Sequence, residues 1–281
     1  MIMGWMIDEY SRIHRQRTPA VITGKPIALG GSLGRDEATG RGGFVCVQEL
    51  VRRGRLRPGS SVAIQGFGNA GQSIARLLHE AGHRVVAVGD SQGAIHRSEG
   101  FDIPSLIHYK NETRRLQAVY CQGSVCEMVE ADRITNQALL ELDVDLLVPA
   151  ALENQITAEN AGRVKAPVVV ELANGPTTVE ADEILHRRGV LLVPDILANA
   201  GGVTVSYYEW VQNKAGYYWS ETDVRQRLHE KMAQEFGAVY ELMETHRVEL
   251  RTAAYVQALV RIGQAHESQG TRRYFMESQA T

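Results

Sequence analysis

The chain has 281 residues, 44% of them hydrophobic and 22% charged, with a formal net charge of −3. This size allows one large domain or two small ones with a buried core. The weak net charge gives no reason to expect nucleic acid or an anionic membrane as a partner, and no apolar run is long enough to span a bilayer.

The cysteines are Cys46, Cys121 and Cys126, and they form no Cys-x-x-Cys pair. We therefore expect no disulfide framework and no metal site, and a cytoplasmic location with reducing conditions. Cys46 stands in an apolar run and is expected to be a buried small hydrophobic residue.

The first predicted element is a helix over 1–16, because apolar residues recur there at helical spacing. An irregular segment rich in glycine and proline follows from Thr18 to Gly34, and a second helix is predicted over 37–54. The apolar stripe of the first helix is complete from its start. We therefore expect residues 1–34 to pack on a further domain that normally precedes them.

From residue 61 onward, short apolar runs alternate with helical patterns. Strands are predicted at 61–66, 84–89, 144–148, 168–172 and 190–193. Helices are predicted at 70–81, 103–110, 136–142, 158–164, 179–188, 200–214, 221–245 and 251–267, with a mixed region over 100–143 and a tail from Ser268 that should fray.

Continuous apolar strands separated by helices predict an α/β fold, in which a doubly wound, mostly parallel sheet of the Rossmann type has flanking N- and C-terminal helices. We expect this domain to cover 35–220, between the segments 1–34 and 221–281. Asp143 and Asp145 flank the start of a predicted strand and are expected to be solvated.

The sequence Gly66-Phe67-Gly68-Asn69-Ala70-Gly71 joins the first predicted strand to a helix. The first glycine permits a tight turn, the second lets the backbone approach a pyrophosphate, and the third lets helix and strand pack closely. The N–H groups at the start of the helix can bind phosphate. This context predicts a nicotinamide dinucleotide site formed by these six residues.

Asp90 ends the second predicted strand and is expected to accept hydrogen bonds from the adenosine ribose, which favours NAD. The residues Asp90-Ser91-Gln92-Gly93 would also make a good turn, and both roles can coexist. NADP stays open as the alternative, because Ser91, or His96 and Arg97, could meet a 2′-phosphate.

Polar loops follow the three later strands, where ligands of such sheets lie. Asparagine side chains there can both donate and accept hydrogen bonds, although asparagine is also common in loops that bind nothing. The candidate binding residues in these loops are Ala150, Ala151, Asn154, Asn174 and Asn199.

Five motifs in this order resemble the C-terminal part of glutamate dehydrogenase, in the superfamily that includes leucine, phenylalanine and valine dehydrogenases. The motifs are Ser32–Gly42, Gly66–Gly71, Pro149–Asn154, Ala173–Thr178 and Asn199–Trp210. The resemblance implies that Thr39, Asn69 and Asn174 hold the nicotinamide and its ribose. It also implies that Val203 and Ser206 line the substrate pocket, where the hydroxyl favours glutamate over branched-chain or aromatic amino acids.

Members of this family carry their catalytic lysine and aspartate in an N-terminal domain, and the chain begins just after the position of that aspartate. No lysine here stands in the catalytic context, so we expect no catalytic residue among these 281 and no useful turnover by the isolated chain. With that domain supplied, the resemblance implies conversion of L-glutamate and NAD(P) to 2-oxoglutarate and ammonia. A non-catalytic NAD-binding protein that pairs with a full-length relative is the second hypothesis, and a branched-chain or aromatic amino-acid dehydrogenase is the third. The family forms homo-oligomers, but the state of this chain stays open.

Overall fold

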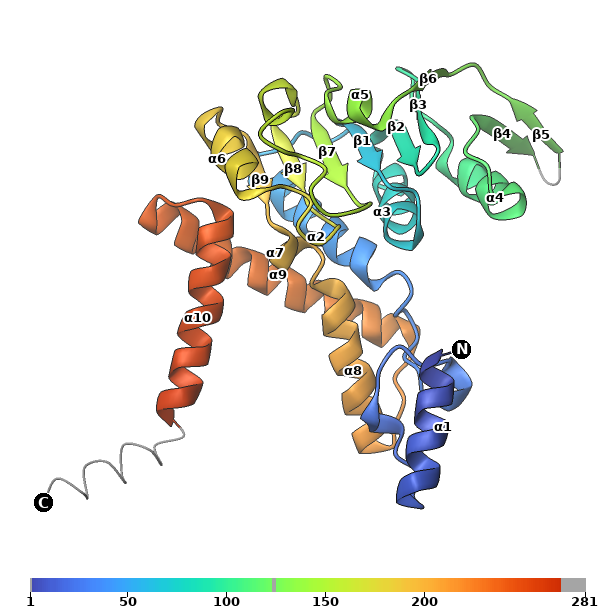
Figure 1. The fold of residues 1–281 in the computed structure, drawn as a ribbon, viewed down its shortest axis with the longest axis vertical. Coiled ribbons are helices and arrows are strands. Elements are labelled where there is room, and N and C mark those ends of the chain that lie inside the picture. Colours follow the sequence, from blue (N-terminus) through green and yellow to red (C-terminus); the bar gives the residue numbers. More distant parts are fainter. Residues whose placement is uncertain (1, 123–124, 269–281) are drawn as a thin grey trace, which may run out of the picture.

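A seven-stranded sheet forms the centre of the computed structural model, which describes residues 2–122 and 125–268 (Figure 1). The strand order is β6-β3-β2-β1-β7-β8-β9. Five strands run parallel: β1 (Ser61–Gln65), β2 (Arg84–Asp90), β7 (Leu146–Pro149), β8 (Val168–Val170) and β9 (Leu191–Val193). Two short strands extend one edge, with β3 antiparallel to β2 and β6 antiparallel to β3: β3 (Gly93–His96) and β6 (Asp132–Ile134).

Helices cover both faces of the sheet and continue beyond it (Figure 1). The α-helices are α1 (Ile2–His14), α2 (Ala38–Arg52), α3 (Asn69–Glu80), α4 (Ile103–Thr113), α5 (Asn136–Leu140), α6 (Val179–Arg187), α7 (Asp195–Ala198), α8 (Gly201–Ala215), α9 (Glu221–His246) and α10 (Leu250–Ser268). In the part of the chain that the structure describes, three 3₁₀ turns, η1 (Pro19–Val21), η2 (Ile27–Leu29) and η3 (Ala161–Arg163), and a separate hairpin of β4 (Val119–Gln122) and β5 (Val125–Met128) complete the fold.

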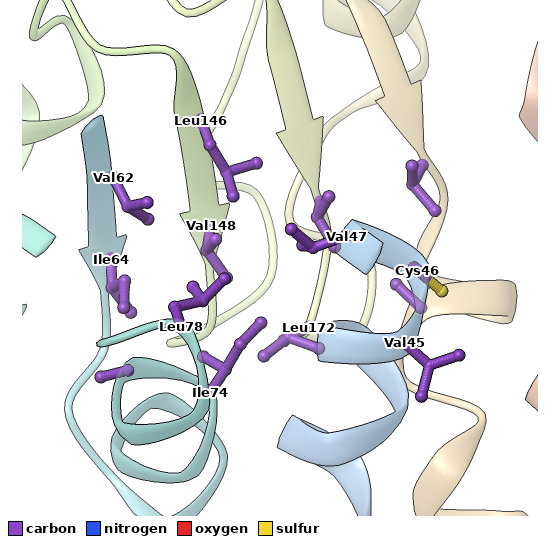
Figure 2. Close-up of a cluster of buried hydrophobic side chains, with 14 of the residues drawn as sticks. Val45, Cys46, Val47, Val62, Ile64, Ile74, Leu78, Leu146, Val148 and Leu172 are labelled. Carbon is purple, nitrogen blue, oxygen red and sulfur yellow. The ribbon is translucent and has the colours of Figure 1, made fainter. Parts of the chain in front are cut away.

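The core divides into two buried clusters because side chains alternate between the faces of each strand. On one face, Val62 and Ile64 of β1 and Val148 of β7 point toward α2 and α3 (Figure 2). On the other face, Ala63 and Leu147 pack with α5 and α6. Both faces of the parallel strands are therefore buried, and the predicted doubly wound, mostly parallel fold is confirmed.

The order of the strands reverses at β1. The chain continues from β1 to β2 on one side of it, and later returns to form β7 on the other side. In open α/β sheets, ligands bind outside the carboxyl ends of the strands at such a switch point. The glycine turn that follows β1 occupies this place.

All five predicted strands are present, and most predicted helices begin and end within three residues of the expected positions. The helix predicted over 158–164 is wrong, because only the short turn η3 forms there. The strands β3 to β6 went unpredicted. They are three or four residues long, and β6 has two charged residues among its three, so no hydrophobic period marks it. The tail predicted to fray lies, from residue 269, outside the described residues.

Two smaller expectations also need correction. The pairing of β4 with β5 sets Cys121 opposite Cys126, and the two form a disulfide, so the expectation of none is wrong. Asp145 is not a solvated acid: it accepts hydrogen bonds from the backbone N of Ser61 (2.8 Å) and from Arg57 (3.0 Å), and so ties two neighbouring strands. Cys46 is fully buried as expected, and burial raises the pKa of its thiol to about 12.

Within the described residues, we find no helix whose length and apolar character would let it cross a bilayer.

Candidate functional site

The turn after β1 depends on glycine at two positions for different reasons. Gly66 has φ of 100°, and a Cβ there would lie 2.6 Å from the carbonyl carbon of Ala150. Its N–H donates to the carbonyl of Gly89 (2.9 Å), which fixes the turn against β2. A Cβ at Gly71 would collide with the carbonyl oxygen of Gly66, so α3 can start this close to β1 only with glycine there.

Gly68 differs from both, because a Cβ at this position would meet no atom within 4 Å. It faces open space directly before α3, and as the N-cap residue it has no side chain to cap the first N–H groups of that helix. Uncapped N–H groups and the positive end of the helix dipole favour an anion. The turn therefore fits the pyrophosphate of a dinucleotide, as the sequence pattern predicts.

Helix α2 brings a third element to this turn. A Cβ at Gly40 would lie 2.7 Å from the carbonyl oxygen of Ala70, so α2 crosses the first turn of α3 at backbone contact. The hydroxyl oxygen of Thr39 would lie 2.7 Å from a Cβ at Gly202, at the start of α8. The start of α2 therefore lies between the beginning of α3, which it meets at Gly40, and the beginning of α8, which it meets at Thr39.

The loops after the later strands meet at the same edge of the sheet. The N–H of Ala150 donates to the carbonyl of Gln65 (2.7 Å), which sets Ala150 and the following Ala151 beside the glycine turn. Asn199 donates to the side-chain oxygen of Asn174 (2.8 Å), so two of the three asparagines are in contact.

Asn154 does not join this pair. Its backbone has φ of 53° and its N–H donates to the carbonyl of Gly175 (2.8 Å). It therefore closes a loop, which is the ordinary role of asparagine in a left-handed conformation.

Asp90 lies at the end of β2, where the sequence places it. One carboxylate oxygen accepts from the N–H of Gln92 (2.8 Å), which is the expected turn, and the other pairs with Lys110 on α4. Lys110 is not predictable from the sequence, because no local pattern indicates that a helix twenty residues later returns to this strand end. Ser91, the next residue, is exposed.

His96 and Arg97 do not lie near that end of β2. Because β3 runs antiparallel to β2, His96 is opposite Ala87, well back from the carboxyl edge of the sheet. Their side chains approach acids of their own, Asp132 (3.7 Å) and Glu99 (3.4 Å) respectively.

The two residues expected in the substrate pocket both lie on α8. Val203 is 69% exposed, and the hydroxyl of Ser206 accepts a hydrogen bond from Nε of Arg35 (2.9 Å). Arg35 is not among the predicted site residues, although it stands in the motif Ser32–Gly42. Its signal was a cationic residue placed just before a glycine-rich helix.

A buried ion pair fixes the segment that carries Arg35. The ammonium of Lys25 pairs with the carboxylate of Glu209, and neither side chain is exposed to solvent. Glu209 also accepts from the backbone N–H of Gly24 (2.9 Å). The irregular segment 18–34 is thereby held on α8, and Arg35 keeps its position opposite Ser206.

Charged side chains also hold the surrounding helices. Glu37, just before α2, accepts hydrogen bonds from Arg41, from Arg76 of α3 and from Arg225 of α9. Burial alone would raise the pKa of Glu37, but Arg41 and Arg225 together outweigh it and hold that pKa below its usual value.

Arg251 of α10 forms ion pairs with Glu171, Asp182 and Asp195 and so joins this helix to the ends of β8 and β9. Burial raises the pKa of Glu171 even though Arg251 opposes this shift. Asp195 in addition accepts from the N–H of Gly175 (2.8 Å), which links α10 to the loop that carries Asn174.

Comparison with known proteins shows the family of the chain. The profile of the glutamate/leucine/phenylalanine/valine dehydrogenase family matches residues 30–270. The chain is 50% identical over 279 residues to an NADP-specific glutamate dehydrogenase of a Synechocystis species. It is 47% identical over 270 residues to the catabolic NAD-specific glutamate dehydrogenase RocG of Bacillus subtilis. These matches cover 99% and 96% of this chain, but only 65% and 61% of the relatives.

Solved structures of glutamate dehydrogenases also match the chain. A hetero-hexameric glutamate dehydrogenase of Thermus thermophilus matches with a TM-score of 0.86 and 34% identity, over 96% of this chain and 62% of that one. The glutamate dehydrogenase of Peptoniphilus asaccharolyticus matches with a TM-score of 0.79 and 37% identity, over the same shares. The chain belongs to the glutamate/leucine/phenylalanine/valine dehydrogenase family and corresponds to somewhat less than two thirds of the length of these relatives.

Proposed function

We propose that this chain is the dinucleotide-binding part of a glutamate dehydrogenase, which converts L-glutamate, NAD(P) and water to 2-oxoglutarate, ammonia and NAD(P)H. The observation that carries the proposal is the position of the start of α2, where Gly40 lies against Ala70 of the glycine turn and Thr39 lies against Gly202 of α8. The start of α2 therefore joins the turn proposed to bind pyrophosphate to the helix that carries Ser206. Relatives named as NADP-specific and as NAD-specific support the cofactor class.

Each group of residues has a part in this proposal. The turn Gly66–Gly71 and the N-terminus of α3 hold the pyrophosphate, and Asp90 and Ser91 hold the adenosine ribose. The residues proposed to hold the nicotinamide and its ribose are Thr39, Asn69, Ala150, Ala151, Asn174 and Asn199. When bound, the cofactor supplies a nicotinamide ring that accepts hydride from the α-carbon of the amino acid. The chain's contribution is to orient the two reacting carbons.

Glutamate is the proposed substrate because of the contact between Arg35 and Ser206 (2.9 Å). Val203, which is exposed, precedes Ser206 by three residues and so lies on the same side of α8. A guanidinium and a hydroxyl side by side suit a carboxylate, which they can bind by charge-assisted hydrogen bonds. A leucine or phenylalanine side chain would instead leave both polar groups without partners.

The proton chemistry is assigned to the part of the relatives that this chain does not span. The family resemblance implies a catalytic lysine and aspartate there, so the 281 residues alone are proposed to be inactive. A non-catalytic subunit that pairs with a full-length relative is the second candidate, favoured by the exposed apolar residues Trp5, Met6 and Ile13 of α1. Assembly as a homo-oligomer in the cytoplasm, without nucleic acid or membrane partners, belongs to the same proposal.

The test is a fusion of this chain to the N-terminal part of the Synechocystis relative that it does not span. We expect the fusion to reduce NAD or NADP with glutamate, and the 281-residue chain to show no turnover. In the fusion, Arg35→Met should raise the KM for glutamate roughly tenfold or more, since hydrogen bonds to charged groups are lost. Arg187→Met, at an exposed position on α6, is the matched control.

Two results would contradict the proposal. A fusion that oxidises leucine or phenylalanine faster than glutamate would assign the chain to another branch of the family. Turnover by the 281-residue chain itself would show that the catalytic groups are within it.

A further inference from the structure

The ion pair between Asp90 and Lys110 changes what the end of β2 offers to a cofactor. The two side chains are 12% and 17% exposed, so solvent screens them little. Asp90 is held in place on its backbone side as well, since Asn136 donates to its carbonyl oxygen (2.7 Å). The carboxylate at this strand end is therefore fixed and neutralised by a cation from α4.

Asp90 also lines a cavity of about 390 Å³, whose other walls come from the end of α4 and from β3 and β6. Its lining includes Arg114, Arg115 and Arg133 together with Asp90. Arg133 donates one N–H to the side chain of Gln117 (3.1 Å), which leaves its other donors available. Positive charge prevails around this cavity.

An unpaired carboxylate at the end of the second strand selects NAD for two reasons. It accepts hydrogen bonds from the ribose hydroxyls, and it repels the 2′-phosphate of NADP, which carries about −1.5 to −2 charges at pH 7. A lysine that pairs with the carboxylate removes most of that repulsion. The carboxylate oxygens keep lone pairs with which to accept from a ribose hydroxyl.

We propose that Lys110 sets the cofactor preference of this chain by neutralising Asp90. The adenosine site at Asp90 and Ser91 then binds the 2′-phosphate of NADP as well as the free ribose of NAD. Arg114, Arg115 and Arg133 supply the positive surroundings for that phosphate. This inference rests on the proposed dinucleotide-binding function, and it names Lys110 as the residue that determines specificity.

The test measures binding of NADPH and NADH to the 281-residue chain by calorimetry, without any assay of turnover. The unaltered chain should bind the two with dissociation constants within about tenfold of each other. Lys110→Met should weaken NADPH at least tenfold and NADH less than threefold, whereas Lys110→Arg should keep both within threefold. Lys231→Met, which breaks the ion pair with Glu235 on α9, is the matched control and should change neither.

The mechanism is tested in the background of Asp90→Asn. Without the carboxylate there is nothing for the lysine to neutralise, so adding Lys110→Met should cost NADPH binding less than threefold. The full tenfold loss in that background would overturn neutralisation as the mechanism. Circular dichroism of each variant checks that the fold is retained.

The remaining outcomes are also decisive. Equal weakening of NADH and NADPH by Lys110→Met, or no effect on NADPH, would overturn the role of Lys110. An unaltered chain that binds NADH but not NADPH would overturn this inference alone. A chain that binds neither dinucleotide would contradict the proposed function itself.

Discussion

The glycines of the turn after β1 serve different physical ends. Gly66 has a left-handed φ and no space for a side chain beside Ala150, so a side chain there would destabilise the fold. Gly68 has φ of −87° and faces open space, so folding does not require glycine there. Glycine at this position instead lets a ligand approach the backbone closely, which is the expected property of a backbone that binds pyrophosphate.

We therefore expect Gly66→Ala to lower the free energy of unfolding by about 1–3 kcal/mol, from backbone strain and the clash with Ala150. Urea unfolding followed by circular dichroism measures this. Gly162→Ala is the control, because a Cβ there meets nothing within 4 Å and its φ is not positive. If Gly66→Ala lowers the free energy of unfolding as little as Gly162→Ala does, the turn tolerates a side chain.

The residues of the glycine turn and Asp90 could be predicted because one local stretch contains the whole signal. Lys110 and Arg35 could not, since each acts on a residue far along the chain. Arg35 and Ser206 are 171 positions apart, and only the packing of the segment before α2 onto α8 brings them together. Pairs of this kind depend on tertiary structure, which local periodicity does not encode.

At the scale of elements, helix α2 organises the site. Glycines on its first turns let it touch α3 and α8 at backbone distance. Glu37 then ties α2 to α3 and α9 through Arg76 and Arg225. The strands of the central sheet were predictable from continuous apolar runs. The hairpin of β4 and β5 was not, because its residues are partly polar and it packs on α4 rather than in the sheet.

The lowered pKa of Glu37 predicts how stability depends on pH. A carboxyl group whose pKa is lower in the folded state stabilises the fold above its unfolded pKa, near 4.5, and loses that effect as pH falls through the folded pKa. Glu37→Gln should therefore lower the free energy of unfolding by about 1.5–3 kcal/mol at pH 7 and by much less at pH 3.

Denaturant unfolding at a series of pH values measures this difference. Glu80→Gln is the control, because Glu80 pairs with Arg76 on the exposed surface and should contribute little. A penalty for Glu37→Gln that stays constant from pH 7 to pH 3 would contradict the ionic role of Glu37.

At the scale of the whole molecule, the Rossmann-type sheet is complete while helices at both ends keep apolar surface exposed. On α1 these residues are Ile2, Trp5, Met6, Tyr10 and Ile13, and on α10 they are Tyr255, Val256, Leu259, Val260 and Ile262. Figure 1 shows α10 extending away from the sheet. The prediction that residues 1–34 pack on a further domain agrees with the exposure of α1.

The central claim is that the open turn at Gly68 holds a dinucleotide, and titration of the 281-residue chain with NADH tests it most directly. Calorimetry should give saturable binding with one site per chain. Gly68→Ala should weaken NADH binding at least tenfold and leave the unfolding curve unchanged. The added methyl group meets no protein atom within 4 Å, but it fills space that the pyrophosphate is proposed to occupy. Absence of binding, or equal affinity in the Gly68→Ala variant, would contradict the account.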